Sequence, residues 1–252
     1  MKKTSNEQML KACIMFGALV IILVIIIGII LKYQVEGEKN VPFYLAEMNV
    51  ISTAEGVGNQ EATEMRWNMN IFQNNDIYLK IAKNENNKKA EKIEKVAIEN
   101  LQITKTPQKG TIQAYMPNST EGRTFSYDEQ YIFQNQLTYT GSSKSDQQNL
   151  EIGNQGGMIV FRISNTNIGT YQSDEDEEVI HNGTILNKIN TTTEEVQFEV
   201  SFDVAIYLDH NVYRTNIQLT LPTGNIAEEG TSYIEKKDMS NLVYKRYFLF
   251  NE

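Results

Sequence analysis

The feature that most constrains this chain is an unbroken apolar stretch near its N-terminus. Residues 12–31 read ACIMFGALVIILVIIIGIIL and contain no charged side chain. A helix of this length is about 30 Å long, which matches the hydrocarbon core of a bilayer. A cleaved signal peptide has a shorter apolar core and a small-x-small cleavage site, whereas this stretch runs directly into Lys32 and Tyr33. The sequence therefore predicts an uncleaved signal anchor that crosses the bilayer once.

Basic residues near the two ends of the stretch predict its orientation, because they are retained on the cytoplasmic side. Three lysines and one glutamate precede the stretch, and glutamates predominate after Lys32. We expect an N-terminal cytoplasmic tail in a single-pass protein of the cell membrane, with residues 33–252 extracytoplasmic. The expected segments are a tail at 1–11, a transmembrane helix at 12–31 and a linker at 32–40.

The outer part of the chain, residues 33–252, is acidic. The chain has 23 basic and 32 acidic side chains, of which four basic and one acidic lie in residues 1–32. Residues 33–252 therefore carry 19 basic and 31 acidic side chains, a net charge of −12. This negative net charge argues against a nucleic-acid partner.

The single cysteine, Cys13, lies in the apolar stretch, so the outer part has no disulfide. With its many Asn and Ile residues, the sequence is typical of a bacterial surface protein.

Alternation with a period of two predicts the strongest structural element. Apolar residues occupy every second position from 196 to 208 and again from 213 to 221, with a polar turn, Asp209-His210-Asn211, between them. A strand places alternate side chains on opposite faces of a sheet. The two runs are therefore predicted to form a long antiparallel hairpin, which ends at Pro222 and Gly224.

Shorter runs predict further strands separated by turn residues. Two of them, 67–71 and 77–81, flank a predicted turn at Asn74-Asn75-Asp76, and residues 87–95 have a weak helical pattern. The remaining predicted strands lie at 42–52, 96–104, 111–116, 131–139, 158–164 and 242–250. Many short strands and almost no helix are typical of an all-β sandwich.

Two arrangements of these strands fit the sequence. Residues 141–157 form a polar connector between a first lobe, 41–140, and a second lobe, 158–252. Each lobe has about the size of an immunoglobulin-like sandwich, which favours two tandem sandwiches. The alternative is one larger sandwich, which the length of the predicted hairpin favours.

Residues capable of catalysis or metal binding are sparse. The two histidines, His181 and His210, both lie in turn-like sequence, and residues 33–252 contain no cysteine. Thiol catalysis and cysteine-type zinc sites are therefore excluded from this part, and we expect neither a cofactor nor an enzyme. The acidic run 173–178 provides weak calcium ligand candidates, because calcium binds carboxylate oxygens; these candidates are Asp174, Asp176 and Glu178.

These observations predict a membrane-anchored protein with a binding or structural role. Its expected partners are the bilayer, through residues 12–31, and proteins of an envelope-associated assembly. One alternative is a surface protein that binds carbohydrate or cell-wall glycan, using some of the 13 tyrosines. Another is a hydrolase with two carboxylates from different strands, which glycoside hydrolysis would require. Glu199 and Asp203 lie too far apart along one strand, at about 13 Å, to form such a pair.

Overall fold

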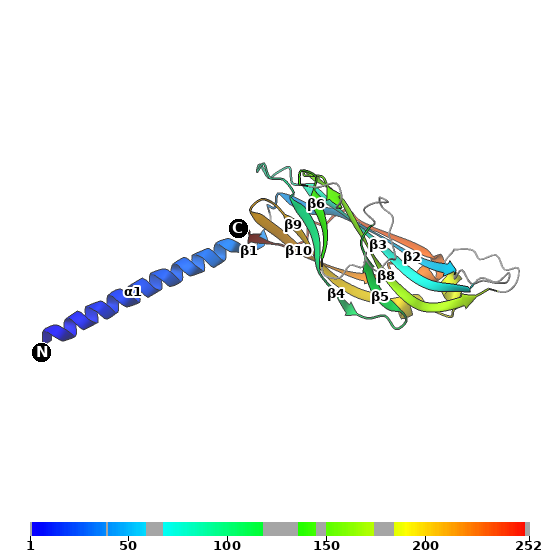
Figure 1. Cartoon of the computed structure of the whole chain (residues 1–252), viewed down its shortest axis with the longest axis horizontal. Helices are drawn as coiled ribbons and strands as arrows, with labels where there is room; N and C mark the ends of the chain where they lie inside the picture. The colour runs from blue at the N-terminus through cyan, green and yellow to red at the C-terminus, as the bar shows by residue number, and fades with distance from the viewer. Residues whose placement is uncertain are drawn as a thin grey trace.

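The protein consists of one long helix and two β-sheets. The computed structural model describes residues 2–38, 40–58, 68–117, 136–144, 150–173 and 184–249. The chain is mostly β-strand, as the alternating sequence predicts. Its strands form a seven-stranded sheet and a five-stranded sheet. Figure 1 shows helix α1 (Lys2–Tyr33) extending away from the strands.

Helix α1 carries the apolar stretch and is attached directly to a sheet. Its segment Gln8–Ile29 is long and apolar enough to cross a membrane, and every side chain in this segment is exposed. The chain continues from α1 without a gap into β1 (Gln34–Glu38), which pairs antiparallel with β12 (Tyr244–Phe248). Residues 34–38, expected as a linker, therefore form the edge strand of the seven-stranded sheet.

The seven-stranded sheet contains the predicted hairpin. Strands β9 (Phe198–Tyr207) and β10 (Asn211–Leu221) pair in one continuous antiparallel register, so this prediction is confirmed. The sheet has the order β1-β12-β10-β9-β4-β6-β7. Its other members are β4 (Lys95–Lys105), β6 (Gln136–Gly141) and the short β7 (Glu151–Ile152). Strand β7 lies inside the expected polar connector 141–157.

The five-stranded sheet contains the longest strands, in the order β11-β2-β3-β8-β5. Its members are β11 (Thr231–Lys236), β2 (Phe43–Gly58), β3 (Asn68–Lys83), β8 (Gly156–Gln172) and β5 (Thr111–Tyr115). Strand β3 is continuous, so the turn predicted at 74–76 is wrong. The connection from β3 to β4 contains no helix, so the helical pattern at 87–95 was also misleading.

The two sheets share one hydrophobic core. A single cluster of buried side chains contains residues of both sheets, and the ring of Phe161 in β8 packs edge-on against Phe202 in β9, with 5.2 Å between the ring centroids. Residues 41–140 and 158–252, expected as separate lobes, contribute strands to both sheets, since β3 pairs with β8 and β4 pairs with β9. The strands of these two ranges are therefore interleaved in both sheets.

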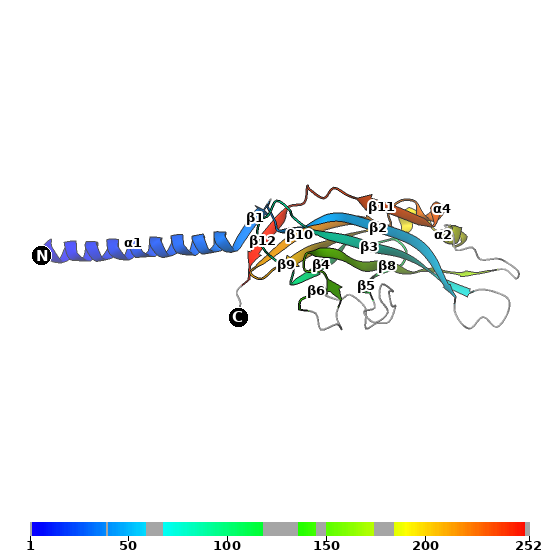
Figure 2. The same cartoon turned by 90° about the horizontal axis from the view of Figure 1, so that it is seen from above.

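A second, smaller core lies at the end of the five-stranded sheet far from α1. Figure 2 shows α2 (Thr184–Lys188) and α4 (Ile226–Glu229) at this end, and α3 (Thr193–Val196) contributes Val196 to the same cluster. Between the two cores, neighbouring strands bury a group of polar side chains. Asn75 of β3 accepts hydrogen bonds from Ser52 Oγ (2.8 Å) and Gln73 Nε2 (2.6 Å), and its Nδ2 donates to the Ile163 carbonyl (2.9 Å).

Candidate functional site: a pocket beside the anchor helix

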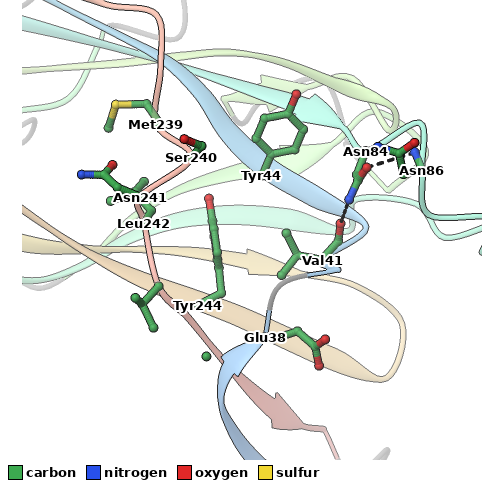
Figure 3. A pocket seen from close by; sticks show the side chains of 12 residues that line it. Glu38, Val41, Tyr44, Asn84, Asn86, Met239, Ser240, Asn241, Leu242 and Tyr244 are labelled. Carbon is green, nitrogen blue, oxygen red and sulfur yellow. Dashed lines mark hydrogen bonds between the residues drawn. The ribbon is translucent and has the colours of Figure 1, made fainter.

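A pocket of about 630 Å³ lies between β1, β2 and the segment that leads into β12. Figure 3 shows Tyr44 of β2 and Tyr244 of β12 lining it, with the side chain of Tyr244 pointing toward the ribbon of β2. Asn84 and Asn86 come from the turn after β3. The remaining lining residues are Gly37, Glu38, Val41, Met239, Ser240, Asn241, Leu242 and Val243.

The pocket exists because strand β11 covers only part of β2. β11 pairs with residues 48–53 of β2, and the chain then leaves this sheet and crosses to the other one to begin β12. The first residues of β2 therefore have no neighbouring strand on that side. The Tyr244 hydroxyl takes the place of a neighbouring strand at Leu45, because it accepts a hydrogen bond from the Leu45 amide at 2.8 Å. Burial raises the pKa of Tyr244 to about 12, so the hydroxyl stays protonated at neutral pH.

Asparagine side chains hold one wall of the pocket in place. Asn84 donates from Nδ2 to the Val41 carbonyl (2.9 Å), and its Oδ1 accepts from the Asn86 amide (3.0 Å). The Asn84 amide also donates to the Pro42 carbonyl at 2.8 Å, and Asn87 Nδ2 donates to the Asn40 carbonyl at 2.8 Å. These bonds tie the turn after β3 to the start of β2, so this wall is ordered before a ligand arrives.

The charged groups of the pocket lie at its margins. Glu38 pairs with Arg246 of β12 across 3.5 Å, and it is the only carboxylate among the lining residues. Nearby Asp238 accepts a hydrogen bond from the Ser240 amide at 2.9 Å. Hydrogen bonds from Ser240 lower the pKa of Asp238. The lining offers amides, hydroxyls, aromatic rings and apolar side chains, which suits binding better than acid–base chemistry, for which paired titratable groups are needed.

Of the residues singled out from the sequence, those that the structure describes do not line this pocket. Asp174, Asp176, Glu178 and His181 lie outside the described residues, and within the described ranges no group of three His, Cys, Asp or Glu side chains is placed to hold a metal ion. His210 lies in the turn between β9 and β10, where its Nε2 is 2.9 Å from Asp209 and its ring stacks on Phe248.

Glu199 and Asp203 have separate partners, as their spacing predicts. Glu199 lies 3.8 Å from the ammonium group of Lys105. Asp203 accepts hydrogen bonds from Asn100 (2.7 Å) and Asn216 (2.8 Å). Neither carboxylate faces the other, so the structure assembles no hydrolytic pair from these two residues.

Sequence reasoning missed a charged cluster on the outer face of the seven-stranded sheet. Glu99 of β4 accepts hydrogen bonds from the Tyr207 hydroxyl and from Arg214 Nη2, both at 2.5 Å. The ammonium of Lys95 lies 4.0 Å from the centre of the Tyr207 ring. Burial and then the neighbouring Glu99 raise the pKa of Tyr207 to about 12. These side chains lie on three adjacent strands, and their mutual bonds indicate a structural role.

No protein-family model matches this chain, and neither does any curated protein or solved structure.

Proposed function

We propose that this protein is anchored in the cell membrane by α1, with residues 33–252 folded as an extracytoplasmic β-sandwich that binds other components of an envelope-associated assembly. Support for the anchor comes from Gln8–Ile29, an apolar helix whose side chains are all exposed. A surface of this kind needs an apolar environment. Support for the orientation comes from the lysines that precede the helix.

The observation that carries the binding role is the pocket at the uncovered edge of β2. A strand without a neighbour can accept an extended segment of a partner through backbone hydrogen bonds, while adjacent side-chain pockets provide specificity. Here residues 43–47 of β2 have no neighbouring strand on this side and border the 630 Å³ pocket with its asparagine, tyrosine and apolar lining. Of their amides, that of Leu45 is already bonded to the Tyr244 hydroxyl. We therefore infer that the bound component is a protein segment in extended conformation.

A neighbouring edge extends the surface available to a partner. Strand β11 is the outermost strand of the five-stranded sheet. Two of its apolar side chains are exposed, Tyr233 at 57% and Ile234 at 40%. Natural sheets usually protect such an edge with charges, and β11 carries them only at its last two residues, Glu235 and Lys236. The edge of β11 and the pocket together favour a protein partner.

A glycan ligand is the second candidate, because the pocket combines an exposed aromatic ring with amide groups. Tyr44 is 36% exposed and lines the pocket with Asn84, Asn86 and Asn241. An aromatic face and a few amide hydrogen bonds are sufficient to orient a polar ligand. The two candidates differ in size: a protein segment would continue along the β2 edge, and a sugar would remain within the pocket.

Crosslinking in intact cells, followed by purification through a tag on the C-terminal end, tests the proposal. The expected result is a reproducible protein partner that is lost in the double variant Y44A/N241A. It should be retained in the matched variant Y78A/N100A, which alters a tyrosine and an asparagine that do not line the pocket. Recovery of wall glycan alone would replace the protein partner with the second candidate. Recovery of the same material with both variants would contradict a role for the pocket.

A further inference from the structure

Several segments that are distant in the sequence meet at the end of the β-region nearest α1. β1 and β12 pair there, and the Leu249 amide donates to the His210 carbonyl at 2.8 Å, which joins the turn between β9 and β10. Figure 2 shows β1 and β12 together at this end, next to α1. The β3–β4 connection joins them through the Glu94 amide, which donates to the Tyr207 carbonyl at 2.9 Å. The proximal end is defined here as residues 34–38, 83–95, 142–144, 208–211 and 244–249.

The proximal end differs in charge from the rest of the outer part. It has eight basic and six acidic side chains, whereas the other described residues of 33–252 have eight basic and 13 acidic ones. Within the described part, the net charge is therefore +2 at the proximal end and −5 over the remainder. The described part of the chain is thus more cationic on the side from which α1 emerges.

The lysines of the β3–β4 connection are the cationic groups best placed to meet a surface. Lys88 and Lys92 are exposed, and exposed Lys89 has only a distant carboxylate neighbour, Glu91, at 3.9 Å. Two other cations of the proximal end have carboxylate partners: Lys144 pairs with Glu94 at 2.6 Å, and Arg246 pairs with Glu38 at 3.5 Å.

The attachment of α1 keeps this end near the bilayer. Five residues of β1 span about 17 Å, and β1 is hydrogen-bonded to β12 along its length. The headgroup layer on each side of the hydrocarbon core is about 5–8 Å thick. Phe248, which is 38% exposed at the end of β12, adds an apolar ring to this end of the β-region.

We propose that the proximal end rests on anionic lipid headgroups, with Lys88, Lys89 and Lys92 as the contacting residues. Lysines close to a membrane surface are attracted to anionic lipids, and the attraction decays within one Debye length. This inference rests on the proposed function, because α1 must span the bilayer for the proximal end to face it. It adds a second contact with the membrane, one that fixes the tilt of the β-region.

Fluorescence quenching by headgroup-labelled lipid tests the docking in the full chain. The chain would carry C13S and a fluorophore on A90C, since Ala90 is exposed among the three lysines. It would be reconstituted in nanodiscs of neutral lipid or of lipid with about 30% anionic headgroups. We expect at least twofold more quenching on the anionic discs, falling to the neutral level when salt is raised from about 0.05 M to about 0.5 M. A fluorophore on Q108C, an exposed position in the β4–β5 turn, should show no such difference.

Charge variants separate the lysines from a general charge effect. K88Q/K89Q/K92Q should reduce the quenching at A90C to the neutral-lipid level, and K80Q/K105Q/K236Q, which removes three exposed lysines elsewhere, should leave it unchanged. Equal quenching on both kinds of disc, or no effect of the first variant, would overturn the docking while leaving the anchor intact. A chain that elutes without the discs would instead overturn the proposed function, and the docking with it.

Discussion

The hydroxyl of Tyr139 in β6 makes two hydrogen bonds with the backbone of Val160 in β8. It donates to the Val160 carbonyl at 2.6 Å and accepts from the Val160 amide at 3.1 Å. Strand β5 pairs with β8 only at residues 162–166, so the hydroxyl takes the place of a strand at Val160. The Tyr244 hydroxyl does the same for the Leu45 amide on β2. Two tyrosines of one sheet therefore satisfy uncovered backbone of the other.

Replacing Tyr139 with phenylalanine should destabilise the fold. The variant removes one hydroxyl and leaves a buried amide and carbonyl without their partner, which costs about 1–3 kcal/mol. The free energy of unfolding can be measured by denaturant titration of the full chain in detergent, with circular dichroism as the signal. Y233F is the matched control, because this hydroxyl is exposed and its bond to Asn49 is long, at 3.2 Å; its effect should be below about 0.5 kcal/mol. Equal effects would contradict the role given to Tyr139.

Stability should also fall at alkaline pH. Burial raises the pKa of Tyr139 and of Tyr244 to about 12, above their ordinary value of 10.0. A raised pKa means that the folded state favours the neutral hydroxyl. The contribution of these two hydroxyls to the free energy of unfolding is therefore complete below pH 10 and is lost as pH rises toward 12. The free energy of unfolding, measured from pH 8 to 12, should decline over that interval. The decline should be shallower in Y139F/Y244F, and an identical slope in both proteins would count against these two tyrosines.

How far the sequence predicts the fold is clearest from β3 and β10. The alternation in β10 is regular, and Asn211–Leu221 forms the predicted strand. In β3, Asn74-Asn75-Asp76 has the composition of a turn, and yet it lies inside a continuous strand. Asn75 is fully buried because Ser52, Gln73 and Ile163 satisfy its amide group. These partners come partly from other strands, so local sequence cannot show that a polar triplet belongs in a strand.

The candidate site was hidden from sequence reasoning for a similar reason. Its wall residues Glu38, Tyr44, Asn84 and Asn241 are spread over some 200 positions. They come together only because β11 stops short of the start of β2 and the chain then crosses to the other sheet. No spacing rule describes such a crossing. The available signal was the charged run at residues 235–238, within which β11 ends.

Asn75 itself provides a test of the buried polar group between the two cores. N75A removes three hydrogen bonds and leaves the Ile163 carbonyl unsatisfied, so we expect a loss of about 1–3 kcal/mol in the free energy of unfolding. N86A changes an exposed asparagine side chain and should cost less than about 0.5 kcal/mol. Denaturant titration of both variants measures the difference. A stable N75A protein would mean that this polar group contributes little to the fold.

The single core can be tested with a double-mutant cycle across the two sheets. Phe161 and Phe202 are in ring contact, so F161L and F202L should be coupled by about 0.5–1.5 kcal/mol. F161L and I185V should be additive, because Ile185 belongs to the second core. Denaturant titration of the wild-type protein, the three single variants and the two double variants gives both coupling energies. Additivity of the first pair would contradict the packing of the two sheets against each other.

The central claim is that α1 crosses the membrane and leaves the β-region outside. Cysteine accessibility tests it directly in intact cells that express the full chain with C13S and Q108C. A membrane-impermeant maleimide should label position 108, an exposed residue of the β4–β5 turn, before the cells are permeabilised. A second protein with its only cysteine at Gln8 should be labelled only after permeabilisation. Labelling of position 108 that requires permeabilisation would contradict the account.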